Sequence, residues 1–285
     1  MLAIVGTVPD PRVPVLGGEA TMEAGHVVIE GRHFPVNRGT PALVAAAIQI
    51  CRVLGRPLPL AYLVGDIGRG DGSRKLYRFL SEKLGGLHHD VIAFHYLQPD
   101  VDWHNRVLFA VEEMERRPVL IADAGFMYAA KMSGQAGQYD LFTPDIGELT
   151  FLADEEAPHP FYTRGFIFQQ ESEVPGLIAR AFQFKNAAKY LLVKGNRDYI
   201  AGENNVSETV EQPAEEAMEA IGGTGDTLTG IVAALIDSGM DIQHAAVRAA
   251  KINRIAGCYA NPSPATQILE IIEQIPNAMS IGINT

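Results

Sequence analysis

With 285 residues, 47% of them apolar and 20% charged, the chain is long enough for one large α/β domain or two smaller ones, and its composition is typical of a globular protein that folds throughout. A net charge of −11 argues against nucleic acids and membranes as partners, because both polyanions attract clustered Lys and Arg. The first ten residues lack the basic start and the apolar length of a signal peptide or membrane span, which favours a cytoplasmic location.

Short runs rich in Val, Ile and Leu alternate with longer segments of helical period, a pattern that indicates βαβ units and a mostly parallel sheet. Strands are expected at residues 2–5, 26–29, 60–64, 91–94, 119–122, 139–142 and 190–193. Helices are expected at residues 40–55, 73–85, 100–117 and 175–188, and two more follow Asp226, the second from Asp241 to about Tyr259. Several strands lack strict alternation, as do strands covered on both faces.

No internal repeat or low-complexity linker interrupts the chain, so a single domain is expected over residues 1–285. One long irregular segment, residues 153–175, carries four aromatic residues: Phe161, Tyr162, Phe166 and Phe168. Long loops in compact domains commonly serve function or assembly. The segment is therefore interpreted as a subunit contact or an active-site flap, with a simple surface excursion as the alternative.

The cysteines and histidines show no metal-ligand spacing. Cys51 and Cys258 lie far apart on predicted helices and are interpreted as reduced core thiols. A group of histidines without a usable ligand pattern is interpreted as ordinary surface or loop residues: His88, His89, His95 and His104. Walker A, H-E-x-x-H and G-x-S-x-G sequences are also absent, so the chemistries that depend on them lack support.

A glycine-rich stretch, EAIGGTGDTLTGIVAAL at residues 219–235, leads through Asp226 into an apolar helix. A helix N-terminus exposes unpaired N–H groups and a partial positive charge, and glycines let the backbone approach an anion closely. The stretch is interpreted as a phosphate cradle, and Asp226 as a general base that faces an attacking hydroxyl, because the anion would repel a carboxylate. In the alternative, Asp226 is only an N-cap and the glycines form only a turn. The cradle consists of Gly222, Gly223, Thr224 and Gly225.

This stretch resembles the C-terminal signature of the ribokinase-like superfamily of sugar and vitamin kinases, and more closely that of the branch containing the NAD(P)H-hydrate dehydratases. Further segments resemble this branch in order and spacing: VLIADAGFM at 119–127, LFTPDIGEL at 141–149 and LLVKGNRDYI at 191–200. The resemblance covers nearly all of residues 119–257. It implies a three-layer α/β/α sandwich with a mostly parallel central sheet, and an enzyme that binds ATP or ADP with Mg²⁺.

The resemblance also implies roles for single residues. Asp226 becomes the catalytic base beside the phosphate cradle. Lys194 and Gly195 border the nucleotide phosphates, and Asn253 lies on the nucleotide side. From the residues alone, Lys194 merely ending a strand is an equal alternative.

Two acidic residues, Asp145 and Glu148, match the family's Mg²⁺-organising motif, with Asp in the place of the usual Asn. Asp123 ends a strand and is expected on the substrate side of the cleft. Because ligands of open α/β sheets bind outside the carboxyl ends of the strands, a site role is favoured for Glu148 and Asp123 over that of a solvated charge.

The N-terminal half resembles the kinase run in which a Gly-rich turn, a small-residue helix and a VGD loop form the substrate side. The substrate residues implied there are Arg38, Gly39, Thr40, Asp66 and Gly68. Residues 1–118 then form mainly the substrate side, and residues 119–285 the nucleotide and catalytic side. The chain departs from the family at Leu43, where the kinases carry Asn, and no Gly-Pro-Gly-Leu-Gly loop occurs near residues 94–105. A dinucleotide fingerprint in GDIGRGDGS is disfavoured, because its glycine spacing differs from G-x-G-x-x-G.

The sequence thus predicts a phosphotransferase that moves a phosphoryl group from ATP or ADP to a hydroxyl of a small metabolite. One alternative is an NAD(P)H-hydrate dehydratase, in which elimination follows phosphorylation. Another is a nucleotide-binding protein without catalysis. A small-molecule substrate, a nucleotide and a second copy of the chain in a homo-oligomer are the expected partners.

Overall fold

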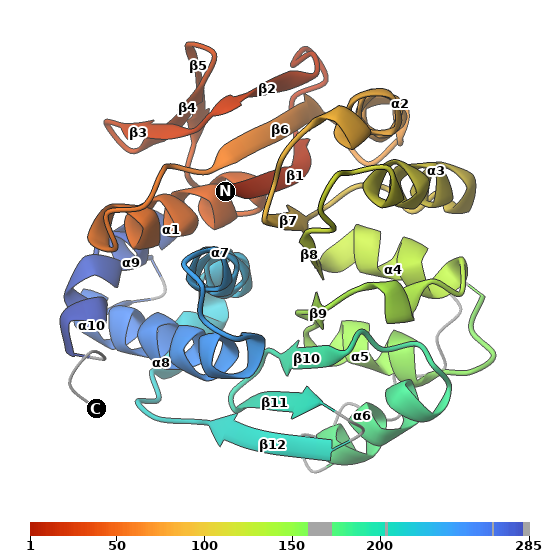
Figure 1. Ribbon diagram of the computed structural model, residues 1–285. Coiled ribbons are helices and arrows are strands. Elements are labelled where there is room, and N and C mark those ends of the chain that lie inside the picture. Colours follow the sequence, from red (N-terminus) through yellow and green to blue (C-terminus); the bar gives the residue numbers. More distant parts are fainter. Residues whose placement is uncertain (159–172, 203–204, 264, 282–285) are drawn as a thin grey trace.

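The computed structural model describes residues 1–158, 173–202, 205–263 and 265–281. In this part of the chain, a nine-stranded sheet with the order β12-β11-β10-β9-β8-β7-β1-β6-β2 forms the centre of the molecule (Figure 1). The strands are β1 (Leu2–Val8), β2 (Leu16–Glu19), β6 (Leu60–Gly65), β7 (Val91–Phe94), β8 (Val119–Ala122), β9 (Leu141–Phe142), β10 (Tyr190–Val193), β11 (Asp198–Gly202) and β12 (Asn205–Val210). Strands β6, β1, β7, β8, β9 and β10 are parallel, and β2, β11 and β12 add antiparallel edges.

Helices cover both faces of this sheet, which gives the expected three-layer α/β/α arrangement. One face carries α1 (Thr40–Val53), α7 (Thr224–Asp237), α8 (Ile242–Ala260), α9 (Ile268–Ile272) and α10 (Ile275–Ile281). The other carries α2 (Asp71–Lys83), α3 (Val101–Glu112), α4 (Ala124–Met132), α5 (Ile146–Ala153) and α6 (Val174–Gln183). Strand β1 alternates between the two cores: Leu2 and Ile4 face α1 and α7, whereas Ala3 and Val5 face the other layer.

Helix α7 lies against the sheet beside α1, and a glycine permits this close approach. A methyl group on Gly230 would lie 2.2 Å from the backbone oxygen of Leu43. No larger residue fits there without separating the helices. The carboxyl end of β1 and the N-termini of α1 and α7 are thereby brought together.

The predicted strands and helices are confirmed with small shifts, and the chain contains more elements than the sequence predicted. The strand predicted at 26–29 is β4 (His26–Ile29), but it belongs to a separate antiparallel sheet with β3 (Thr21–Glu23) and β5 (Arg32–Pro35). The reason lies in its flanking turns, where left-handed backbone at Ala24, Gly25, Glu30 and Gly31 closes two hairpins.

Two sequence interpretations are wrong. Cys51 is buried as expected, but Cys258 is exposed, because it falls on the outer side of α8. Among the histidines interpreted as surface or loop residues, His89, His95 and His104 are buried. Most of the aromatic segment, residues 159–172, lies outside the described residues.

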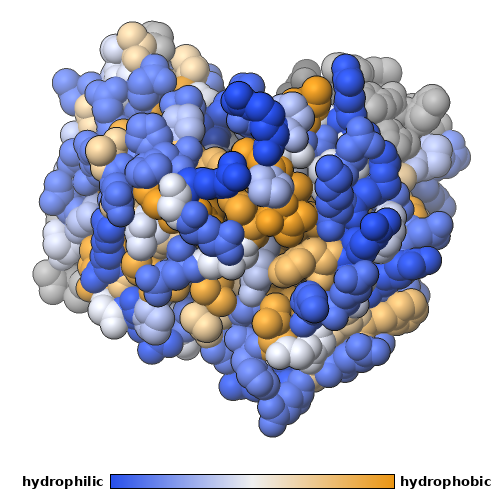
Figure 2. Space-filling model, turned by 90° about the horizontal axis from the view of Figure 1, so that it is seen from above, coloured by the Kyte–Doolittle hydropathy of each residue, from blue (hydrophilic) through white to orange (hydrophobic). Residues whose placement is uncertain are grey.

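Seen from above, the surface is largely hydrophilic, and apolar residues gather in the middle of this face (Figure 2). Among the described helices, none combines the length and hydropathy that a membrane span requires.

The strand order places a switch point between β1 and β7. The chain goes from β1 to β6 on one side and then crosses to β7 on the other, from where β8, β9 and β10 follow in order. Open α/β sheets bind ligands outside the carboxyl ends of the strands at such a point.

Candidate active site

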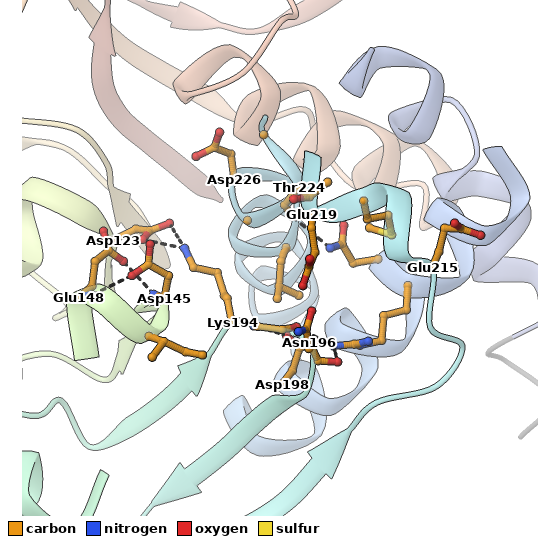
Figure 3. A pocket seen from close by; sticks show the side chains of 18 of the residues that line it. Asp123, Asp145, Glu148, Lys194, Asn196, Asp198, Glu215, Glu219, Thr224 and Asp226 are labelled. Atoms are coloured by element: carbon orange, nitrogen blue, oxygen red, sulfur yellow. Dashed lines mark hydrogen bonds and ion pairs between the residues drawn. The ribbon is translucent and has the colours of Figure 1, made fainter. Parts of the chain in front are cut away.

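A cleft of about 940 Å³ opens at the carboxyl ends of the parallel strands, in front of the N-terminus of α7 (Figure 3). Its polar side chains follow directly on these strands: His95 after β7, Asp123 after β8 and Lys194 after β10. Parallel strands therefore deliver residues that are distant in sequence to one edge of the sheet.

The first turn of α7 forms one wall of the cleft. Gly223, Thr224 and Gly225 line it, and no described residue accepts a hydrogen bond from their backbone N–H groups. Gly223 has a φ of 107°, and a side chain there would lie 2.9 Å from Ile268 and 3.3 Å from the backbone of Arg38. These N–H groups are thus available to an anion, as the glycine-rich sequence predicts.

Asp226 lies in the same turn with its carboxylate held by two donors. Oδ2 accepts a hydrogen bond from the backbone N–H of Gly39 at 2.6 Å, and Oδ1 lies 3.0 Å from Nε2 of His95. Burial alone would raise the pKa of Asp226, but the hydrogen bonds from His95 and from the backbone of Gly39, together with the charge of Lys194, lower it below its usual value. The carboxylate is therefore kept ionised, the form that can accept a proton.

His95 extends this contact to the start of α1. Its side chain is buried, and Nδ1 lies 3.0 Å from Oγ1 of Thr40. The only sequence signal for His95 is its position directly after a predicted strand, the same position that singled out Asp123.

Lys194 and Asp123 form a buried ion pair opposite Asp226. Lys194 Nζ lies 2.9 Å from both carboxylate oxygens of Asp123, and Oγ1 of Thr229 donates to the same carboxylate at 2.7 Å. Burial alone would lower the pKa of Lys194, but Asp123 and Glu148 raise it above its usual value. Lys194 is thus a permanent cation in the cleft.

Asp145 and Glu148 cap the N-terminus of α5 reciprocally. The backbone N–H of Glu148 donates to Asp145 Oδ1 at 2.7 Å, and that of Asp145 donates to Glu148 Oε2 at 2.9 Å. Burial and the charge of Asp123 raise the pKa of Glu148 to about 8. No group of three or more His, Cys, Asp or Glu among the described residues is arranged around a common metal position. A pair of carboxylates nevertheless fits Mg²⁺, which proteins commonly hold through one or two carboxylates and substrate phosphates.

The nucleotide-side residues also build the cleft. Asn253 lines it, but its side chain braces the first turn of α7: it accepts from Thr227 Oγ1 at 2.7 Å and donates to the carbonyl of Thr224 at 3.0 Å. Gly195 lines it too, and its carbonyl accepts a 2.9 Å hydrogen bond from Arg254.

The residues predicted on the substrate side are not all brought to the cleft. Gly39 and Thr40 do not line it, but they lie behind the lining residues and contact Asp226 and His95. Asp66 and Gly68 do not line it, because the Asp66 carboxylate accepts the N–H groups of its own turn, including Gly68 at 2.9 Å.

The predicted substrate residue Arg38 and one predicted member of the phosphate cradle, Gly222, are likewise outside the lining. Arg38 lies behind Gly223, and Gly222 is exposed beside it.

Sequence analysis did not identify most residues that form the outer wall of the cleft. Arg254 comes from α8, and the others follow β10 or lie on the irregular stretch before α7 with η6 (Glu216–Ala220): Asn196, Asp198, Pro213, Ala214, Glu215, Glu216, Met218 and Glu219. This stretch has neither strand nor helix periodicity, so only its position before the glycine-rich turn could have pointed to it.

The amino-acid sequence is similar to a known family and to several known proteins. A family model described as NAD(P)H-hydrate dehydratase matches residues 98–277. An uncharacterized protein of Methanocaldococcus jannaschii is 45% identical over 216 residues, which are 75% of this chain and 88% of that protein. The bifunctional NAD(P)H-hydrate repair enzyme Nnr of Pyrobaculum aerophilum is 27% identical over 90% of this chain, which spans 50% of that enzyme's length. The ADP-dependent (S)-NAD(P)H-hydrate dehydratase of Cenarchaeum symbiosum is 27% identical over 61% of this chain and 55% of its own.

Solved structures share the fold at low sequence identity. A ribokinase-like superfamily protein of Enterococcus faecalis aligns with a TM-score of 0.60 at 15% identity, over 99% of this chain and 87% of that one. Phosphofructokinase-2 of Escherichia coli in complex with fructose-6-phosphate aligns with a TM-score of 0.55 at 13% identity, over 98% of this chain and 100% of its own.

Proposed function

Because this chain belongs to the NAD(P)H-hydrate dehydratase family, within the ribokinase-like superfamily, we propose that it uses ATP or ADP to dehydrate hydrated NAD(P)H. The observation that carries the proposal is the pairing of Asp226 with free backbone N–H groups in one turn of α7. An ionised carboxylate beside an anion site provides a base next to the group that is transferred.

In the first step, Asp226 takes the proton of the substrate hydroxyl. The hydroxyl oxygen forms a bond to the terminal phosphorus of the nucleotide, and the phosphoanhydride bond breaks with its electron pair leaving on the shortened nucleotide. The N–H groups of Gly223, Thr224 and Gly225 and the cation of Lys194 stabilise charge on the phosphoryl oxygens. Mg²⁺ bound at Asp145 and Glu148 would add positive charge beside the phosphates.

In the second step, the carbon–oxygen bond of the phosphorylated ring breaks and inorganic phosphate leaves with the electron pair. The neighbouring ring carbon loses a proton to the departing phosphate, and the electron pair of the broken carbon–hydrogen bond restores the ring double bond. The products are NAD(P)H, inorganic phosphate and the shortened nucleotide. Phosphorylation turns a poor leaving group, hydroxide, into a good one.

A kinase with a stable phosphorylated product is the second candidate, and the segment after β7 favours it. His95 and Tyr96 follow β7 and line the cleft. In this region the dehydratases are expected to carry a Gly-Pro-Gly-Leu-Gly loop. Such a change at the cleft wall would alter which hydroxyl compound fits, while the first step stays the same.

Loss of catalysis is less well supported. Leu43, one of the two departures that motivate it, is buried in α1 and does not line the cleft. The other, Asp145, retains a carboxylate in the cleft wall.

One experiment separates these functions. The protein is incubated with hydrated NADH and either ATP or ADP, while nicotinamide absorbance and the ³¹P NMR spectrum are recorded. A dehydratase regenerates NADH and releases an equal amount of inorganic phosphate. A kinase leaves the hydrate unchanged and yields a stable phosphate ester with another acceptor from a metabolite panel. Thermal stabilisation by nucleotide without turnover would identify a binding protein.

The homo-oligomer and the single-domain organisation stay predictions. Sedimentation velocity at several protein concentrations tests the first. The cytoplasmic location also stays a prediction.

A further inference from the structure

The line of contacts Thr40–His95–Asp226 joins three elements in the buried floor of the cleft. Asp226 begins α7, His95 follows β7 and Thr40 begins α1. Oγ1 of Thr40 lies 3.0 Å from His95 Nδ1, and His95 Nε2 lies 3.0 Å from Asp226 Oδ1. Both Thr40 and His95 are fully buried, so water does not compete for these contacts.

The fold makes room for this line at Gly6 of β1. A methyl group on Gly6 would lie 2.5 Å from Oγ1 of Thr40 and 2.8 Å from the backbone oxygen of His95. Only glycine lets the helix start and the histidine meet across the end of β1.

The hydrogen-bonding partners define which nitrogen of His95 carries the proton. An ionised carboxylate can only accept, so Nε2 must be protonated to donate to Asp226. In neutral His95, Nδ1 then accepts from the Thr40 hydroxyl, which fixes this tautomer and the ring orientation.

We propose that His95, with its tautomer fixed by Thr40, is the positioning residue that orients the Asp226 carboxylate and keeps it ionised for proton abstraction. The inference rests on the proposed function, because it takes Asp226 as the base. In this role His95 is not the base; it acts through Asp226.

The surroundings support a histidine that serves Asp226 rather than another group. Asp123 Oδ2 lies 4.0 Å from His95 Nε2, beyond hydrogen-bond distance, and its charge is matched by Lys194 at 2.9 Å. The Tyr96 ring packs against the His95 ring at 4.0 Å between centroids, and the Tyr96 hydroxyl is neutral because partial burial and the charge of Asp226 raise its pKa. Among the charged groups that face His95, Asp226 is the one in direct contact.

The test measures Asp226 directly by carboxyl ¹³C NMR, with the resonance assigned by its loss in Asp226→Asn. In the wild type, Asp226 should titrate below the usual range for aspartate. In His95→Leu, the midpoint should rise by about one pH unit or more, because the charge-stabilising donor is gone. His95→Gln, which keeps an N–H donor, should show a smaller rise.

Thr40→Val and Thr40→Ser form the matched pair for the tautomer. Thr40→Val should lower the Nε2-protonated population of His95 in ¹⁵N NMR and raise the Asp226 midpoint, whereas Thr40→Ser should return both to wild-type values. This pair and His95→Gln keep the proposal testable if His95→Leu fails to fold.

Kinetic measurements are the second part of the test. In His95→Leu, kcat should fall by roughly 10- to 100-fold, the size of a lost hydrogen bond to a charged group, with the KM for nucleotide unchanged. The acid limb of kcat/KM should move to higher pH by the same amount as the NMR midpoint. An Asp226 midpoint that is unchanged in His95→Leu, or in His95→Gln and Thr40→Val where His95→Leu does not fold, overturns the inference. Shifted midpoints in a protein without turnover leave the positioning contact standing and remove the proposed function instead.

Discussion

Gly223 shows how much of the site depends on one backbone conformation. Its φ of 107° lies in the region that glycine adopts readily, and Ile268 and the backbone of Arg38 leave no room for a side chain. The freedom of this residue therefore turns the first N–H groups of α7 toward the cleft.

Replacing Gly223 by Ala should weaken nucleotide binding and lower the free energy of unfolding by roughly 1–3 kcal/mol, because a strained backbone and a steric clash are added. Gly222→Ala is the matched control, since the nearest atom to its added methyl group lies 3.7 Å away. Calorimetric nucleotide titration and urea unfolding of both variants provide the measurement. Equal behaviour of the two variants would contradict the assigned role of Gly223.

The two cysteines should differ in reactivity. Burial raises the pKa of the Cys51 thiol to about 11, whereas Cys258 is exposed. Since the thiolate is the reactive form, a thiol reagent should modify one site in the native protein, and both only after unfolding. Peptide mapping should find the native label on Cys258. Rapid native labelling of Cys51 would show that α1 is not packed as described.

Individual elements were predictable where their residues were apolar throughout. Strands β7, β8 and β10 are VIAF, VLIA and YLLV, and their bounds match the prediction. Strand β12, NVSETV, was missed because its side chains are mostly exposed and carry no apolar pattern.

Helix α5 was missed although its start has a local signal. Asp145 and Glu148 have the spacing of a capping box, and the structure contains that box. The same two residues match the family's metal motif, and that role stays a prediction. His95 shows the opposite case, because its burial and its contact with Asp226 depend on pairing β7 with β1, which no local pattern predicts.

The backbone is strained at the residue that follows the C-terminal end of α6. Lys185 follows the helix with a φ of 59°, and its side chain is exposed. Lys185→Gly should raise the free energy of unfolding by roughly 1 kcal/mol, because the left-handed conformation costs a non-glycine residue about that much. Lys185→Ala, which keeps the penalty, should bring no gain in the same urea unfolding experiment. A gain in the alanine variant would mean that the lysine side chain, not the backbone, is the source.

At the scale of the whole molecule, buried histidines make the free energy of unfolding depend on pH. Burial lowers the pKa of His89 and of His104 to about 4. Between about pH 6.5 and pH 4, the unfolded chain binds protons at these positions and the folded chain does not. The free energy of unfolding should therefore fall as the pH falls through this window.

His104→Gln should make that fall shallower by up to about 1.4 kcal/mol per pH unit, whatever its effect at neutral pH. His88→Gln is the control, because the His88 side chain is 77% exposed and stays in water in both states. Urea unfolding at a series of pH values gives the slopes. An unchanged slope in His104→Gln would show that His104 is protonated in the folded protein.

The fold class followed from the alternation of apolar runs and helical segments, and the resemblance located the inner wall of the cleft around Asp226. The outer wall of the cleft could not be predicted from the sequence, because the irregular stretch that forms much of it has no helix or strand periodicity. The substrate side was only partly predictable: Gly39 and Thr40 meet Asp226 and His95, whereas Asp66 is occupied within its own turn.

The most direct test compares wild type and Asp226→Asn in the conversion of hydrated NADH with ATP or ADP, with nucleotide affinity measured on the same samples. The rate should fall by about 10²- to 10⁴-fold, the contribution of a general base, while the Kd for nucleotide stays near its wild-type value. A variant that turns over at the wild-type rate would contradict the role of Asp226 as the base in this cleft.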